Sequence, residues 1–192
     1  FIKAYNNRGV AYMQSGKYDL AIADFDAYLA LAPTDPTPYY ARALAQTEAS
    51  HYDRAVEDFS RAIDLGMDDA DTYNNRGSCY ALLDSLDKAL TDYNQAVALD
   101  PDHSYAYTNR ARLQGQLGNY DAALADFNRA AQLDPDNAQA VAGEGVILCM
   151  LGRYAEATPL LNRALALDPS LEPVVAPFRN ALQNPGAAFS EN

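Results

Sequence analysis

The 192-residue sequence has no tryptophan, only two cysteines and no apolar run long enough to span a bilayer. The stretch FIKAYNNRG at its start lacks the apolar segment that a secretory signal requires. Basic residues are also scarce, because 14 Lys and Arg stand against 26 Asp and Glu and give a net charge of −12. Such a chain repels phosphate, so nucleic acids and anionic membranes are poor partners. The acidic surplus either keeps the protein in solution or favours cationic partners.

Residues suited to catalysis or metal binding are few. Cys79 and Cys149 form no ligand or redox motif, and we expect both to be small buried residues without a disulfide. Neither His51 nor His103 has a partner at catalytic spacing. The sequence also has no glycine-rich phosphate loop, metal-ligand cluster or nucleophile motif. We therefore expect no enzymatic activity, no cofactor and no metal within these residues.

A repeat of 34 residues dominates the chain. Four similar segments recur at that step: YNNRGVAY (5–12), YYARALAQ (39–46), YNNRGSCY (73–80) and YTNRARLQ (107–114). A weaker fifth copy is VAGEGVIL (141–148). Since the first repeat begins almost at Phe1 and the chain lacks an initial Met, we expect a processed protein or part of a longer one. A period of this length indicates an array of small units rather than one globular core.

Each repeat is predicted to contain two helices. Ala21, Phe25 and Leu29 follow helical spacing in the second half of the first copy. The first helices are expected to stop at a set of glycines: Gly16, Gly118 and Gly152. Asp-Pro steps should end the second helices at 100–101, 134–135 and 168–169. Aspartates are expected to cap the starts of the second helices: Asp19, Asp53, Asp87 and Asp121.

These positions resemble the tetratricopeptide repeat. The small residues of its eighth position are Gly9, Ala43, Gly77, Ala111 and Gly145. Its twentieth position is always alanine: Ala21, Ala55, Ala89, Ala123 and Ala157. The resemblance implies an all-α, right-handed α-α superhelix of five helical hairpins, with units at 2–35, 36–69, 70–103, 104–137 and 138–171. Residues 172–184 are predicted to form a capping helix with an apolar stripe of Val174, Val175, Phe178 and Leu182, followed by a flexible tail at 185–192.

Arginine and aspartate recur together in four of the five units. The seventh position holds Arg8, Arg42, Arg76 and Arg110, and the twenty-third holds Asp24, Asp58, Asp92 and Asp126. The fifth unit lacks both and carries Glu144 and Leu160. This joint loss favours pairing within each unit. The alternative is a ladder of arginines that binds anionic groups.

In the family that the chain resembles, the first helices line a concave groove. The resemblance places twelve candidate peptide-binding residues there: Asn6, Asn7, Tyr40, Leu44, Asn74, Asn75, Ser78, Tyr105, Thr108, Asn109, Arg112 and Val146. Asn7, Asn75 and Asn109 share one position and are similar to the asparagine ladder of O-linked GlcNAc transferase, although Ala41 and Gly143 interrupt the row. Such asparagines either hold a peptide backbone or bond within their own helix pairs.

The leading hypothesis is a protein-interaction scaffold whose groove takes an extended peptide or a helix of a partner. A carboxylate clamp of the co-chaperone type is not expected, because Val10 and Asp71 replace two of its residues. Two alternatives stay open: a structural module that associates with copies of itself, and a non-catalytic part of a larger enzyme. The partner is thus expected to be a protein or peptide, without nucleic acid binding or membrane insertion, and the sequence indicates no compartment.

Overall fold

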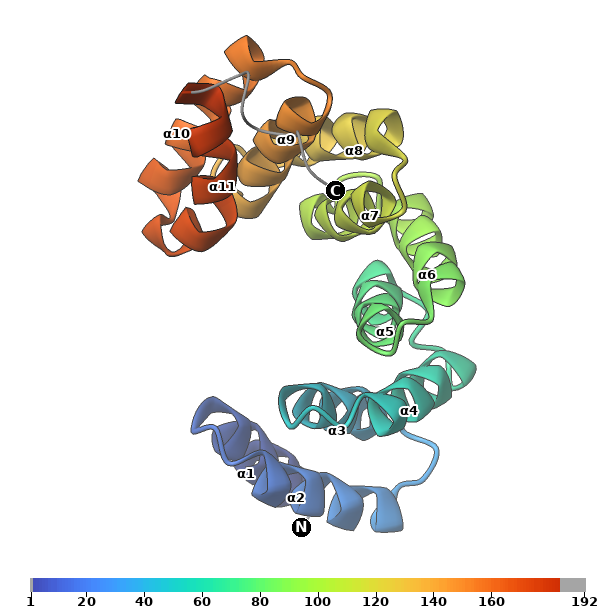
Figure 1. Cartoon of the computed structure of the whole chain (residues 1–192). Helices are drawn as coiled ribbons and strands as arrows, with labels where there is room; N and C mark the ends of the chain where they lie inside the picture. The colour runs from blue at the N-terminus through green and yellow to red at the C-terminus, as the bar shows by residue number, and fades with distance from the viewer. Residues whose placement is uncertain (1, 184–192) are drawn as a thin grey trace. The chain divides into compact units, whose positions relative to one another are not determined.

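The computed structural model describes residues 2–183, with side chains as far as residue 178, and this part of the chain is helical without a strand (Figure 1). It contains eleven α-helices and one short 3-10 helix. They are α1 (Ile2–Gln14), α2 (Tyr18–Leu31), α3 (Pro36–Glu48), α4 (Tyr52–Asp64), α5 (Ala70–Leu82), α6 (Leu86–Leu99), α7 (Ser104–Gln116), α8 (Tyr120–Leu133), α9 (Ala138–Met150), α10 (Tyr154–Leu167), η1 (Pro169–Leu171) and α11 (Glu172–Gln183). The all-α prediction is confirmed, whereas the tail at 185–192 and the side chain of Leu182 lie outside the described residues.

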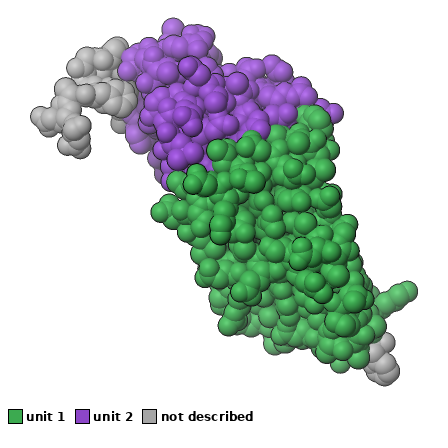
Figure 2. Space-filling view, turned by 90° about the vertical axis from the view of Figure 1, so that its right-hand side faces the viewer, with its two compact units in different colours: residues 1–101 green, residues 102–192 purple. Residues whose placement is uncertain are grey.

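The helices form two compact units, residues 1–101 (unit 1) and residues 102–192 (unit 2), which Figure 2 shows in different colours. Unit 1 holds α1 to α6, and unit 2 holds α7 to α11. Within each unit, every helix packs against the next one along the chain, so each pair forms a hairpin. Alternate helices also touch: α1 with α3 and α3 with α5 in unit 1, and α7 with α9 and α9 with α11 in unit 2.

The turn inside each hairpin depends on one residue with a left-handed backbone. The predicted glycines have positive φ angles of 68° at Gly16, 80° at Gly118 and 74° at Gly152. Ser50 and Asp84 occupy the same position in the other two repeats, with φ angles of 61° and 56°. The turn is so strongly determined by the packing of the two helices that it forms even where the residue has a side chain.

The aspartates that were predicted to cap the second helices do not do so. Asp19, Asp53, Asp87 and Asp121 lie inside the first turn, and the residues at the cap position make no side-chain hydrogen bond there. Their carboxylates instead favour the helix through the positive end of its dipole. Side-chain caps occur at the first helices, where Asp35, Asp69, His103 and Asn137 each accept a bond from a backbone N–H.

Close contact between the two helices of a hairpin follows from small residues that face large ones. A Cβ added to Gly9 would lie 2.8 Å from the ring of Phe25, and one added to Gly77 would lie 2.9 Å from Tyr93. The repeated alanines at the twentieth position are all fully buried. Cys79 and Cys149 are buried free thiols, as predicted, and burial raises the pKa of both.

The helix α11 covers the end of the last hairpin. Val175 is fully buried in the apolar cluster that contains Leu161 and Val141, and Phe178 packs against the same cluster. Val174, on the same predicted stripe, is instead 53% exposed. One part of the stripe therefore fills the core, and another remains available at the surface.

Candidate peptide-binding pocket

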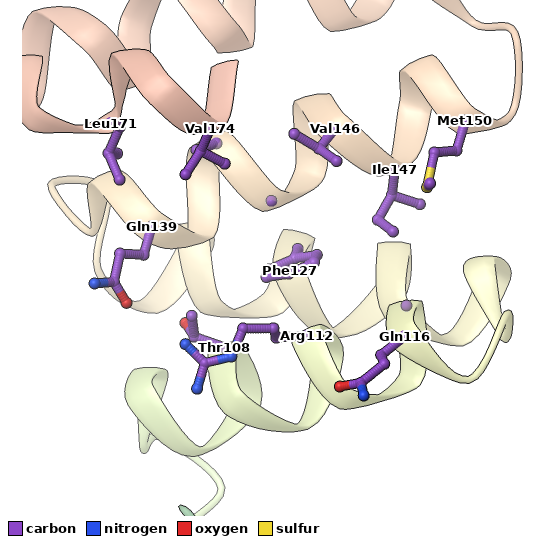
Figure 3. A pocket seen from close by; sticks show the side chains of 13 residues that line it. Thr108, Arg112, Gln116, Phe127, Gln139, Val146, Ile147, Met150, Leu171 and Val174 are labelled. Carbon is purple, nitrogen blue, oxygen red and sulfur yellow. The ribbon is translucent and has the colours of Figure 1, made fainter. Parts of the chain in front are cut away.

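A pocket of about 430 Å³ opens between α7, α9 and α11 in unit 2 (Figure 3). Its apolar walls come from Val146, Ile147 and Met150 of α9 and from Leu171 and Val174 beside them. Phe127 of α8 lies in the middle of this view, between Arg112 and Gln116 of α7 on one side and Val146 and Ile147 of α9 on the other. The volume falls within the range of about 300–1,000 Å³ that is usual for ligand sites.

Two glycines keep this pocket open. A Cβ at Gly143 would lie 2.3 Å from Phe127, so the ring occupies space that any side chain at residue 143 would need. A Cβ at Gly115 would lie 3.0 Å from the end of the Ile147 side chain. Gly143 holds the position at which three of the other four repeats carry asparagine. The break in the asparagine row is therefore what allows an aromatic floor.

Polar groups lie at the rim and not among the apolar walls. Arg112, Gln116 and Gln139 are exposed lining residues, and the two glutamines lie at opposite sides of the view in Figure 3. Arg112 donates from Nη2 to Oδ1 of Asn109 at 3.1 Å. The rim thus offers one guanidinium and two carboxamides, which can donate and accept hydrogen bonds.

Thr108 also lines the pocket, but its hydroxyl is already used. It donates to the carbonyl oxygen of Ser104 at 2.9 Å and accepts from Nδ2 of Asn137 at 3.1 Å. Asn137 donates to the Ser104 hydroxyl as well, and it caps α9 by accepting from the N–H of Ala140. This buried network joins α7 to the start of α9 and fixes the position of these two pocket-lining helices relative to each other.

The structure divides the twelve predicted binding residues between the two units. Thr108, Arg112 and Val146 line the pocket. Tyr105 and Asn109 lie on the same helix as Thr108 without lining the pocket, and Tyr105 is exposed. The other seven belong to unit 1: Asn6, Asn7, Tyr40, Leu44, Asn74, Asn75 and Ser78.

Several of the unit 1 residues contact one another. Asn75 donates from Nδ2 to the hydroxyl of Tyr40 at 3.1 Å, and the Tyr40 ring meets Phe59 edge-on at a centroid distance of 5.7 Å. Burial raises the pKa of Tyr40, with smaller contributions from nearby Asp71 and Asp69. Asn74 is buried, Leu44 is partly buried, and Asn7 is exposed.

Ser78 and the asparagine row are held by contacts inside the protein. Ser78 donates to the carbonyl oxygen of Asn74 at 3.0 Å and accepts from the hydroxyl of Tyr93 at 3.2 Å. Asn75 bonds to Tyr40 of the preceding repeat, and Asn109 accepts from Arg112 of its own helix. Two of the three ladder asparagines therefore have intramolecular partners, and peptide binding by the row stays a prediction.

In the four repeats that contain them, the arginine pairs with the aspartate of its own repeat, as predicted. Each guanidinium donates from Nε and Nη2 to the two oxygens of one carboxylate, at 2.6–2.8 Å, in the pairs Arg8–Asp24, Arg42–Asp58, Arg76–Asp92 and Arg110–Asp126. The same guanidinium groups lie over tyrosine rings of their own repeats: Tyr5, Tyr39, Tyr73 and Tyr107. These arginines are consequently structural, and the alternative of an anion-binding ladder is wrong.

The seventh position also links neighbouring repeats. Arg42 donates to Asp26 of the preceding repeat, and Arg76 donates to the Ser60 hydroxyl at 3.0 Å. In the last repeat, Glu144 accepts from Nδ2 of Asn128 at 3.3 Å. Glu144 thus keeps the contact to the preceding repeat even though the arginine pair within its own repeat is lost.

Side chains that could bind a metal ion do not gather in the described part of the chain. Among residues 2–183 no group of three His, Cys, Asp or Glu side chains is placed to hold a metal ion. His103 uses Nδ1 to accept from the N–H of Ala106, which makes it a helix cap. None of the helices described has both the length and the apolar character needed to cross a membrane.

The pocket contains residues that the sequence did not identify as binding residues. Phe127 and Ile147 belong to positions that normally fill the core, Leu171 is the last residue of the fifth predicted repeat, and Val174 belongs to the segment that was predicted only as a cap. The signal for Phe127 was the unusual Gly143, because a missing side chain on a first helix leaves room for a neighbouring ring. No sequence signal indicated Leu171.

Comparison with known protein families finds one kind of repeat along most of the chain. Models of the tetratricopeptide repeat match residues 2–35, 40–104, 77–144 and 116–182. Among solved structures, MamA 41-end from Desulfovibrio magneticus RS-1 is similar with a TM-score of 0.78 and 19% identity, over 88% of this chain and 96% of that one. A comparison with curated proteins finds no match.

Two further structures are similar. TTC0263, a thermophilic TPR protein in Thermus thermophilus, has a TM-score of 0.73 and 22% identity, over 95% of this chain and all of that one (100%). YrrB, described as a TPR protein with an unusual peptide-binding site, has a TM-score of 0.69 and 24% identity, over 86% and 85% of the two chains. At these identities the likeness establishes the fold alone.

Proposed function

Because this chain belongs to the tetratricopeptide-repeat family, we propose that it binds a peptide segment of a partner protein on its first helices, with the pocket of unit 2 as the anchor. Members of this family are in general scaffolds for protein interaction and not catalysts. The predicted family and fold class are confirmed. The binding site and the form of the bound peptide are our proposal.

The open apolar pocket is the observation that carries the proposal. Met150 is 46% exposed and Val174 is 53% exposed, and both line the pocket. Covering these side chains would remove apolar surface from water, which contributes about 25 cal/mol per Å². The flanking carboxamides of Gln116 and Gln139 would bond to the backbone of the bound segment.

The methionines provide a direct test, because the chain has only three of them: Met13, Met67 and Met150. We would label their methyl groups with ¹³C and titrate the protein with peptides enriched from a random library. The Met150 resonance should shift and saturate, while Met67, which does not line the pocket, should remain unchanged. A shift of Met150 with protein concentration alone, without peptide, would instead indicate self-association and contradict the proposal.

A matched pair of variants tests the location. Val174→Gln places a polar group at the pocket, whereas Leu99→Gln makes the same kind of change at an exposed leucine in unit 1. Peptide affinity should fall roughly tenfold for the first variant, since an apolar contact of this kind is worth about 1–2 kcal/mol. It should stay unchanged for the second. Equal affinities for both variants would place the binding site elsewhere.

A further inference from the structure

Arg112 lacks the carboxylate partner that three other arginines of unit 2 have, and Arg163 donates to the carbonyl oxygen of Pro135 at 2.6 Å. Arg110 is paired with Asp126, Arg129 with Asp102 and Arg153 with Glu156. Arg112 is exposed at the pocket and bonds to the neutral amide oxygen of Asn109. Among residues 2–178, no carboxylate pairs with Arg112. A positive charge thus remains uncompensated beside an apolar surface in a chain with a net charge of −12.

We infer that the pocket selects peptide segments in which an apolar side chain lies close to an aspartate or glutamate. The apolar side chain would contact Phe127, Val146 and Val174, and the neighbouring carboxylate would pair with Arg112. This inference rests on the proposed function, because it specifies which peptides the same pocket binds. It concerns a side-chain carboxylate and needs no free peptide C-terminus.

The local charge decides this preference despite the acidic surface. At physiological salt, charges further away than about 8 Å are largely screened, so only carboxylates closer than that act strongly on a peptide at the pocket. A guanidinium binds a carboxylate through two parallel hydrogen bonds, and such charged bonds are about twice as strong as neutral ones. Nearby apolar walls exclude water and strengthen the pair further.

The rim favours a peptide over another apolar carboxylate such as a fatty acid. The carboxamides of Gln116 and Gln139 are exposed at opposite sides of the pocket in Figure 3. Each can donate to and accept from a peptide unit, whereas an acyl chain has no group to bond with them. The positions of these side chains therefore suit a peptide backbone that crosses the pocket.

The experiment is a selection from a random peptide library on phage against three forms of the full chain: the natural protein, Arg112→Glu and Arg54→Glu. The two variants change the net charge equally, and Arg54 is an exposed residue of α4 in unit 1 that does not line the pocket. The natural protein and Arg54→Glu should enrich peptides that combine apolar and acidic residues. Arg112→Glu should lose this preference and favour Lys or Arg.

Affinities of the enriched peptides give the size of the effect. Arg112→Glu should weaken binding of an acidic peptide roughly 10- to 100-fold, as expected from the loss of a charged hydrogen bond. Replacing the acidic residue of the peptide by its amide should weaken binding to the natural protein similarly and should strengthen binding to Arg112→Glu, because it removes a like charge. Circular dichroism would verify that the variant is folded, which we expect because residue 112 is exposed.

The outcomes separate this inference from the proposed function. Enrichment of the same peptides by Arg112→Glu, with equal affinity, would overturn the role of Arg112 and leave peptide binding intact. Failure of the natural protein to enrich any peptide would overturn both. A saturable shift of the Met150 methyl with decanoate, at concentrations where the enriched peptides cause none, would also overturn the inference in favour of an acyl ligand.

Discussion

The ring of Phe127 lies against the backbone of Gly143, so that a Cβ at residue 143 would be only 2.3 Å from the ring. Phe127 is buried, so its ring cannot move into solvent without leaving the core of unit 2. This contact both packs unit 2 and forms the floor of the pocket. A small change at Gly143 is therefore expected to affect stability and binding together.

We predict that Gly143→Ala lowers the free energy of unfolding by about 1–2 kcal/mol. A contact of 2.3 Å places the overpacking cost at the upper end of the usual range, about 2–3 kcal/mol, and the better helix propensity of alanine offsets about 1 kcal/mol of that. Gly115→Ala is the control, because the closest atom to its Cβ would be the flexible end of Ile147 at 3.0 Å. Urea unfolding followed by circular dichroism measures both variants. A Gly143→Ala variant as stable as the natural protein would contradict the packing described.

Removing one partner of a buried ion pair should cost more than removing both. Arg110 and Asp126 have side chains only 17% and 10% exposed, so Arg110→Met leaves a buried carboxylate without a cation, bonded by Nε2 of Gln114 at 3.1 Å. We expect this variant to lose about 2–3 kcal/mol in urea unfolding. Adding Asp126→Leu should restore most of the loss, since the last repeat naturally has neither partner. A double variant that is less stable than Arg110→Met would refute this account.

The same substitution at Arg8 is a useful comparison. Its side chain is 58% exposed, while its partner Asp24 is buried. We expect Arg8→Met to reduce stability clearly less than Arg110→Met, because the exposed Arg8 side chain covers Asp24 and water can reach this carboxylate once that side chain loses its guanidinium. Arg8 nevertheless lowers the pKa of Asp24.

A hydrogen bond between Tyr28 and Asp35 predicts a specific pH dependence. The Tyr28 hydroxyl donates to Asp35 at 2.6 Å, which lowers the pKa of Asp35 and raises the pKa of Tyr28. Tyr28→Phe should reduce stability by about 1 kcal/mol at neutral pH. Because the folded-state pKa of Asp35 is depressed, this contribution is complete above its unfolded pKa of about 3.9 and disappears as the pH falls through the folded value.

At alkaline pH the contribution of this bond to stability depends on the Tyr28 hydroxyl, and it falls as the pH rises. Since the folded-state pKa of Tyr28 is raised, its contribution is complete below the unfolded pKa of about 10 and is lost as the pH rises through the folded value. The stability difference between the natural protein and Tyr28→Phe should thus be flat at intermediate pH and shrink at both extremes. Urea midpoints measured from about pH 2 to about pH 11 would show this. A difference independent of pH would mean that the bond does not form in solution.

The left-handed turn residues predict a stabilising substitution. Asp84 has a φ angle of 56°, and an ordinary side chain costs about 1–2 kcal/mol in this left-handed conformation. Its carboxylate also follows the C-terminus of α5, where the helix dipole disfavours a negative charge. Asp84→Gly should raise stability by about 1 kcal/mol. The reciprocal change Gly118→Asp, at the equivalent turn of unit 2, should lower it by a similar amount. Thermal unfolding of the two variants measures both changes in stability. A loss of stability in Asp84→Gly would contradict the prediction.

The sequence by itself determined the helical hairpins. The alanines equivalent to Ala21, the turn glycines and the Asp-Pro steps recur at the same spacing. Each segment therefore has few ways to bury its apolar face, so the helices and turns follow from the local sequence. The Arg110–Asp126 type of pair was predictable for the same reason, because the fifth repeat loses both residues together. The prediction of caps was wrong for the second helices, since the exact first residue of a helix depends on packing as well as on side-chain preference.

Only the tertiary structure decided where a pocket opens. Phe127, Gly143 and Val174 lie far apart in the sequence and meet because α8, α9 and α11 pack around one space. Whether Arg112 has a carboxylate partner, and whether the hydroxyl of Thr108 is already bonded, depends on distances between different helices. A repeating pattern specifies what all repeats share, whereas a binding site arises from the residues in which one repeat differs from its neighbours.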